Sequence, residues 1–158
     1  MLEIAVLWLI NKENEILLAK RSLTKSLHPG VWGPTVTGTA EVNETPIQTL
    51  VREVKEELGL KLGDYNPNFL FTTDFNHSDG QVRRFNIYYA LVEKEITNKF
   101  KIDTAEVADM KWLSLKSVKE FLITPVSEFE LVPSAKTVWP KTFEMLENVT
   151  KYITTNRQ

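Results

Sequence analysis

Three glutamates gather near the end of a helix predicted over residues 45–58. Glu53 precedes Glu56 and Glu57 by three and four residues, a spacing that puts all three side chains on one side of an α-helix. Each like-charged pair at this spacing costs roughly 0.2–0.5 kcal/mol, and the negative end of the helix dipole disfavours anions further. A solvated acidic face is the ordinary interpretation of a glutamate-rich helix. Converging carboxylates are also what a hard divalent cation binds, and we expect a metal site here.

The loop before this helix carries residues suited to the same chemistry. Gly38 leaves room for a metal ion or a phosphate to approach the backbone, and Glu44 would add a fourth carboxylate near the helix start. An ordinary turn between a strand and a helix is the alternative interpretation of this loop.

The helix that presents the glutamates has clear ends. Thr45 is expected to cap its start, with Pro46 at the first helical position and Gln48 completing a capping box. Gly59 is placed to end the helix in a left-handed conformation. A projection at about 100° per residue gives an apolar stripe away from the glutamates, which should face the core: Ile47, Val51, Val54 and Leu58.

Residues 38–60 resemble the Nudix box, a motif that reads G-x5-E-x7-R-E-U-x-E-E-x-G-U with U aliphatic. All nine specified positions match in this sequence: Gly38, Glu44, Arg52, Glu53, Val54, Glu56, Glu57, Gly59 and Leu60. The resemblance implies a hydrolase that cleaves a nucleoside diphosphate linked to another moiety by attack of water on phosphorus. A nucleotide-binding regulator without catalysis is the alternative.

The resemblance also implies roles for the residues of the box. Mg²⁺ or Mn²⁺ would be bound by Glu53, Glu56 and Glu57, with Gly38 beside the metal. Arg52 would orient a neighbouring carboxylate rather than contact the substrate. Metal ions neutralise the phosphates and lower the pKa of the attacking water, and a carboxylate then takes the proton. Glu53 is our first choice for that general base.

Many members of the Nudix family add a glutamate from a later loop. Glu106, six residues before Trp112, is the best candidate for this additional ligand or base. Asp103 and Asp109 are its rivals, and an exposed loop acid is the alternative interpretation.

Other residues are weaker candidates. Arg21 and Arg83 could reach phosphates, and Trp32 could border the substrate or pack in the core. Trp32 lies in a P-G-x-W stretch that resembles segments of isopentenyl diphosphate isomerases. Those isomerases use a catalytic cysteine, which this chain lacks, so isomerase activity is disfavoured. His28 and His77 are predicted to be ordinary surface histidines in polar loops.

The surrounding elements mix strands and helices without regular alternation. Strands are expected near residues 4–10, 16–19, 31–38, 65–75, 82–92 and 110–113, and helices near 45–58, 114–122 and 137–153. The pattern predicts the α+β class, and the resemblance implies a Nudix-like α/β/α sandwich with a mixed sheet. We expect a single domain over residues 1–158, with an extra C-terminal helical segment at about 125–158.

Composition narrows the classes of partner. The chain has 158 residues, a net charge of −2 and no cysteine. A disulfide scaffold, a thiolate metal site and a cysteine nucleophile are thereby excluded, and a cytoplasmic location is expected. The charge gives no overall attraction to nucleic acid or to an anionic membrane. We expect a small-molecule nucleotide or other diphosphate as substrate, no nucleic-acid or membrane partner, and allow for a homodimer.

Overall fold

A computed structural model describes residues 1–156, and the side chains of residues 1–152. Its strands are β1 Leu2–Ile10, β2 Glu15–Arg21, β3 Trp32–Gly33, β4 Val36–Thr39, β5 Asn68–Asn76, β6 Val82–Leu91 and β7 Val107–Ser114. Its helices are α1 Pro46–Leu58, α2 Leu115–Ile123 and α3 Ala135–Asn156, with short 3-10 helices η1 Lys94–Lys99 and η2 Ser127–Phe129.

The sheet is mixed, and β1 lies at its centre. The main strand order is β3-β2-β1-β6-β5, while β4 pairs with β1 and β7 pairs with β2. β1 runs parallel to β6 along its whole length and antiparallel to β2 and β4. Successive side chains of a strand point to opposite faces, and β1 is buried on both: Ile4, Val6, Trp8 and Ile10 join one core, and Ala5, Leu7 and Leu9 join the other.

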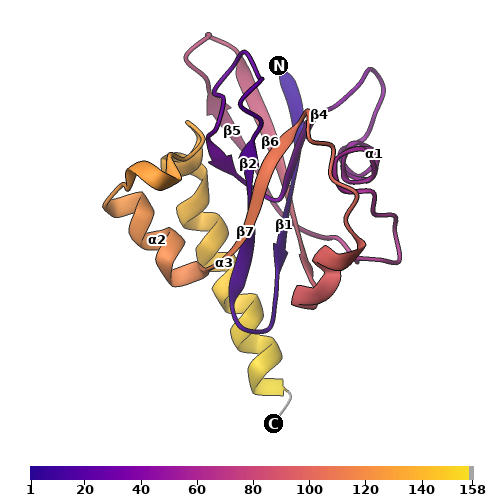
Figure 1. The fold of residues 1–158 in the computed structure, drawn as a ribbon, viewed down its shortest axis with the longest axis vertical. Coiled ribbons are helices and arrows are strands. Elements are labelled where there is room, and N and C mark those ends of the chain that lie inside the picture. Colours follow the sequence, from indigo (N-terminus) through magenta and orange to yellow (C-terminus); the bar gives the residue numbers. More distant parts are fainter. Residues whose placement is uncertain (157–158) are drawn as a thin grey trace.

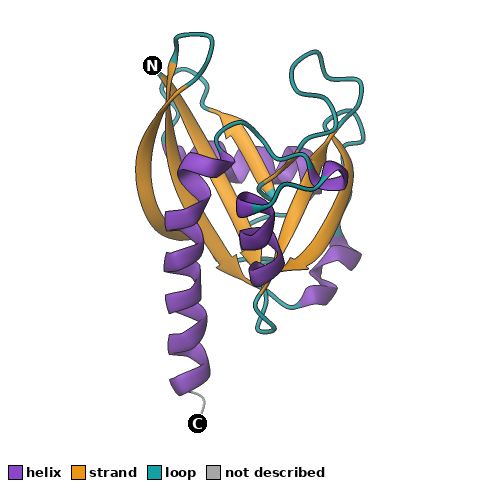
Figure 2. Ribbon diagram, turned by 90° about the vertical axis from the view of Figure 1, so that its left-hand side faces the viewer, coloured by secondary structure: helices purple, strands orange, loops and turns teal. Residues whose placement is uncertain are grey.

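Helices cover both faces of the sheet. Figure 1 shows α1 on one side of the strands and α2 with α3 on the other, and Figure 2 shows α3 running along the sheet beyond its lower edge. Trp8 of β1 packs edge to face against Trp139 of α3, with ring centroids 4.9 Å apart. The predicted α/β/α sandwich of the α+β class is therefore confirmed.

The strand expected over residues 31–38 is instead two strands, and the hydroxyl of Thr35 explains the break. It accepts a hydrogen bond from the Leu9 amide (3.0 Å) and donates one to the Leu17 carbonyl (2.6 Å). Thr35 thus bridges β1 and β2 where the chain crosses between them, so that β3 pairs with β2 and β4 pairs with β1.

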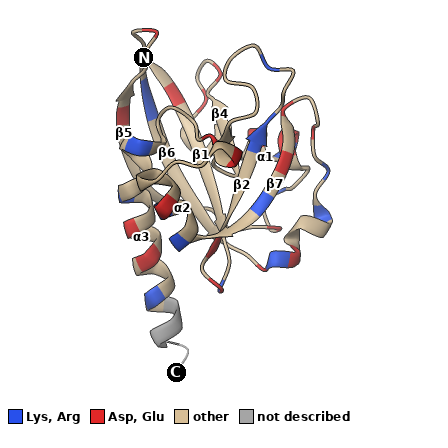
Figure 3. Cartoon of the chain, turned by 60° about the vertical axis from the view of Figure 1, so that its left-hand side comes forward, with Lys and Arg blue, Asp and Glu red and all other residues tan. Residues whose placement is uncertain are grey.

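Charged residues of both signs are interspersed along the elements (Figure 3). In the part of the chain that the structure describes, no helix has the length and apolarity needed to cross a bilayer.

Candidate functional site

Helix α1 begins and ends at the residues that the sequence predicts. The Thr45 hydroxyl accepts a hydrogen bond from the Gln48 amide, and the Gln48 side chain accepts one from the Thr45 amide, which completes the capping box. Gly59 closes the helix with φ +71° and donates its amide hydrogen to the Lys55 carbonyl. The helix is therefore held at both ends on either side of the glutamates.

The buried face of α1 differs from the predicted stripe. Ile47 is 39% exposed, and the buried residues are Thr49, Leu50, Val54, Glu57 and Leu58. The helix is turned so that the edge of its acidic side meets the sheet. Gly38 of β4 makes this possible, because a Cβ at that position would overlap the Glu53 side chain.

Arg52 holds two neighbouring carboxylates in place. It donates to both oxygens of Glu44 (2.8 and 3.0 Å) and to Glu53 Oε1 (2.8 Å). It also reaches Glu56 at 3.3 Å and the Thr39 carbonyl at 3.1 Å. The hydrogen bonds from Arg52 lower the pKa of Glu44 to about 2. Glu44 therefore serves as an anchor for Arg52, and Arg52 orients Glu53.

Glu57 is the most unusual carboxylate of the chain. Its residue is only 9% exposed, and within the side chains that the structure describes it has no hydrogen-bond or ion-pair partner. Burial, followed by the charges of Glu53 and Glu106, raises the pKa of Glu57 to about 8. Burial likewise raises the pKa of Glu53, although Arg52 opposes the shift.

Glu106 approaches these carboxylates from the segment before β7. β7 pairs with β2, and the Ser22 amide donates to the Glu106 carbonyl at 3.0 Å. The Glu106 carboxylate forms an ion pair with Lys25 at 2.6 Å. Lys25, in the loop of residues 22–31, therefore supplies the positive charge that faces Glu106.

One open cavity of about 550 Å³, the outer cavity, brings most predicted site residues together. Its lining includes seven of them: Gly38, Glu53, Glu56, Glu57, Glu106, Arg21 and Arg83. Asp103 also lines it, whereas Asp109 does not. Arg52 lies behind the lining, where it contacts Glu53.

Trp32 is absent from this lining. It is 3% exposed and packs against Phe129, with ring centroids 5.2 Å apart. Of the two interpretations of Trp32, the structure therefore supports a place in the core.

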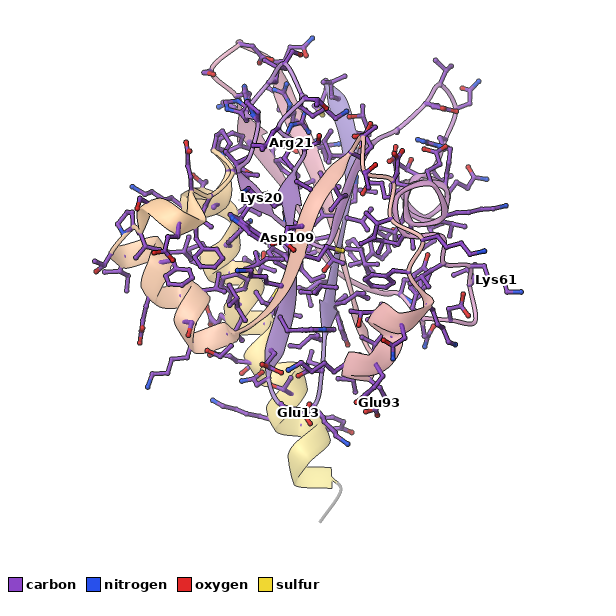
Figure 4. The ribbon with its side chains drawn as sticks, in the orientation of Figure 1. Glu13, Lys20, Arg21, Lys61, Glu93 and Asp109 are labelled. Atoms are coloured by element: carbon purple, nitrogen blue, oxygen red, sulfur yellow. The ribbon has the colours of Figure 1, made fainter. Side chains whose placement is uncertain are left out.

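A smaller, largely apolar pocket of about 200 Å³, the apolar chamber, adjoins the outer cavity. Glu57 and Glu106 are among the residues that line both spaces. The chamber walls are largely apolar and include Trp8, Ile87 and, from α3, Val138 and Trp139. Lys20 and Arg21, labelled at the upper end of β2 in Figure 4, also line it.

Sequence reasoning missed two sets of site residues. His28 and His77, predicted to be surface histidines, both line the outer cavity, and their rings lie 5.9 Å apart. Val138 and Trp139 look like ordinary apolar residues of an amphipathic helix. The sequence gives no sign that either set meets the site, because the contacts join segments far apart in the chain.

The carboxylates fit a divalent cation in composition and burial. Oxygen ligands suit Mg²⁺ or Mn²⁺, and Glu57 is a buried carboxylate with no ion pair among the described side chains, whose burial the charge of Lys25 offsets only in part. Among the described residues, no three acidic or histidine side chains already stand in a metal-binding arrangement. Arg52 and Lys25 hold Glu53, Glu56 and Glu106 in ion pairs instead. Side-chain rotation toward Glu57 would be required to bind a metal.

Comparison with known proteins assigns the chain to a family. The sequence profile of the NUDIX domain matches residues 1–133. Isopentenyl-diphosphate Delta-isomerases of Salmonella paratyphi B and Salmonella heidelberg are each 32% identical over 120 residues, or 75% of this chain. The match covers 65% of the length of those relatives.

Solved structures share the fold at lower identity. DR0079 from Deinococcus radiodurans has a TM-score of 0.72 at 18% identity, covering 88% of this chain and 82% of its own. The MutT protein from Methanosarcina mazei Go1 scores 0.69 at 19% identity, covering 93% and 94%. The NUDIX domain of Shewanella oneidensis NrtR, solved with ADP ribose, scores 0.67 at 20% identity, covering 92% and 88%.

The profile match spans most of the chain and includes the whole segment from Gly38 to Leu60. The capped helix, its glutamates and the mixed sheet agree with it. The chain belongs to the NUDIX domain family.

Proposed function

We propose that this protein is a metal-dependent hydrolase that splits a diphosphate by attack of water on phosphorus. Nucleoside diphosphates linked to another moiety are the first substrates to consider. The observation that carries the proposal is the buried carboxylate of Glu57, which has no ion pair among the described side chains and shares the outer cavity with Glu53, Glu56 and Glu106. A cation is the partner that such a group lacks.

The roles of the residues follow from their positions. Glu53, Glu56, Glu57 and Glu106 would hold Mg²⁺ or Mn²⁺ beside the backbone of Gly38. A bound metal neutralises phosphate charge and acidifies water. Glu53 would accept the proton of the attacking water, because the hydrogen bond from Arg52 at 2.8 Å fixes the position of its carboxylate.

Of the basic residues of the cavity, Arg21 is the first candidate to receive the phosphates. Arg21 and Arg83 both line the outer cavity together with the carboxylates, but Arg83 is paired with Asp79. The absence of cysteine supports a reducing, cytoplasmic setting for this reaction.

A second candidate substrate is a diphosphate ester of a compact apolar group. Two observations favour it: the apolar chamber of about 200 Å³ opens beside Glu57 and Glu106, and the isomerase relatives are named for such a compound. The chain lacks the cysteine that those isomerases use, so hydrolysis remains the reaction that we propose.

A substrate panel tests the proposal. Purified protein is incubated with nucleoside diphosphate derivatives and short alkyl diphosphates, with Mg²⁺ and with Mn²⁺, and released phosphate or nucleotide is measured. We expect turnover of at least one compound and a loss of roughly 10²–10⁴-fold in Glu53→Gln. Glu144→Gln, an exposed change on α3, is the matched control. Saturable binding of the panel without any turnover would favour a nucleotide-binding regulator instead.

A further inference from the structure

We propose that His28 and His77 form a subsite for the terminal phosphate of the substrate, in the outer cavity that the metal-binding carboxylates also line. The inference deepens the proposed function, since it rests on a diphosphate being bound in this cavity. It favours diphosphates with one free end, such as the short alkyl diphosphates of the second candidate class, over nucleoside diphosphates linked to another moiety.

The two histidines meet although they come from separate loops. His28 lies in the loop between β2 and β3, and His77 lies in the turn between β5 and β6. Their rings contact edge to face, with centroids 5.9 Å apart. Figure 1 places both loops at the same end of the sheet, and both side chains line the outer cavity that Glu53 and Glu56 also line.

Hydrogen bonds fix the backbone at or next to each histidine. Arg21 Nε donates to the Leu27 carbonyl at 2.6 Å, next to His28. His28 itself has φ +49°, a conformation that is uncommon outside glycine and persists where the surroundings fix it. On the other side, the His77 amide donates to the Gln81 carbonyl at 3.1 Å, and the His77 carbonyl accepts from Gly80 at 2.9 Å.

The charges around the pair leave donors free for an anion. Arg83 forms two hydrogen bonds to Asp79, at 3.1 and 2.9 Å, so its charge is already balanced. Asp79 also lies 3.7 Å from His77 Nδ1. Arg21, by contrast, contacts no carboxylate among the described side chains. His77 Nδ1 also faces the Ser78 hydroxyl at 3.4 Å, so Arg21, His28 and the Nε2 atom of His77 are the available N–H donors near this pair.

A terminal phosphate suits these donors better than an internal one. It carries up to two negative charges and three oxygens that accept hydrogen bonds, whereas a phosphate esterified on both sides offers two free oxygens and one charge. Imidazole rings donate one or two N–H groups each, and the Arg21 guanidinium adds more. When the carboxylates and their cation hold one phosphate, the two histidines and Arg21 receive the free end of the diphosphate.

Calorimetric binding of methylenediphosphonate, a diphosphate analogue that water does not cleave, tests the subsite in the presence of Mg²⁺. The variants are His28→Asn, in which asparagine tolerates the positive φ, and His77→Asn. We expect each to weaken binding about tenfold, the value of one hydrogen bond to a charged group. Lys12→Gln is the control, because it removes a positive charge in the turn of residues 11–14, at the end of the sheet marked by Glu13 in Figure 4.

Two further readouts separate a binding role from a structural one. The ring signals of both histidines should shift in NMR spectra of the wild-type protein when methylenediphosphonate is added with Mg²⁺. NMR spectra of His28→Asn and His77→Asn also establish that both variants are folded. In turnover, the preference of the wild-type protein for ADP over ADP-ribose should fall about tenfold in each variant, as a change in KM.

The outcomes distinguish this inference from the proposed function. Equal affinity of the wild-type protein and both folded variants for methylenediphosphonate, or unmoved ring signals, overturns the inference even if substrates are cleaved. If no compound of the panel is cleaved but the two variants still lose affinity, the proposed hydrolysis fails and the subsite stands.

Discussion

The substitution Glu57→Gln should change how the stability of the metal-free protein depends on pH. Glu57 is 9% exposed, and burial together with Glu53 and Glu106 raises its pKa from 4.5 to about 8. Between these two values the carboxyl group keeps its proton in the folded protein and loses it in the unfolded chain. The unfolded state then binds fewer protons, so the free energy of unfolding falls as pH rises.

The size of the effect follows from the two pKa values. Each pH unit of separation is worth about 1.36 kcal/mol, so a rise from 4.5 to about 8 gives at most about 5 kcal/mol. Local rearrangement, including movement of Lys25, reduces this maximum. We expect the free energy of unfolding of the wild-type protein to fall by about 2 kcal/mol or more as pH rises between the two pKa values. Glutamine carries no charge, so Glu57→Gln should lack this contribution.

Urea denaturation in the presence of EDTA, at intervals from pH 4.5 to pH 8.5, measures the difference. The other titrating groups are shared by the wild-type protein and Glu57→Gln, so the gap between their curves isolates Glu57. Glu144→Gln, on the exposed side of α3, should follow the wild-type curve. Parallel curves for the wild-type protein and Glu57→Gln would refute the account of a buried carboxylate without an ion pair.

Three further substitutions test the supports of the site. Gly38→Ala places a methyl group against the Glu53 side chain, and activity should fall at least tenfold in kinetic assays while circular dichroism stays unchanged. Arg52→Lys loses the paired hydrogen bonds to Glu44 and should weaken Mg²⁺ binding about tenfold by calorimetry; unchanged affinity would contradict its orienting role. Thr45→Ala removes the helix cap and should cost about 1 kcal/mol in urea denaturation, with Mg²⁺ affinity nearly unchanged.

Local features of the fold were predictable because their causes are local. The capping box at Thr45 and the glycine at position 59 fix the ends of α1 through contacts within a few residues. The rotation of α1 was not predictable in the same way. Ile47 was expected in the buried stripe and is 39% exposed, because packing against β4 at Gly38, rather than the apolar pattern alone, sets which side meets the sheet.

Which residues line the outer cavity depends on contacts between segments that are distant in the chain. Glu106 reaches the glutamates of α1 because β7 pairs with β2, and spacing to Trp112 gave a clue to this. His28 and His77 had no such clue, since their contact joins two loops that each look like polar surface segments. The two apolar residues of α3 that wall the chamber were equally hidden within an amphipathic helix.

The residues of α3 that line the apolar chamber are far along the chain from the carboxylates of α1. Val138 and Trp139 border the chamber, yet they lie more than 75 residues after the glutamates of α1 and beyond the segment that the NUDIX profile matches. Changes in this helix can widen or narrow the chamber while the carboxylates keep their positions. In the proposed hydrolase, the organic groups that fit and the phosphorus chemistry could thus vary independently, which would make α3 the place to redesign selectivity.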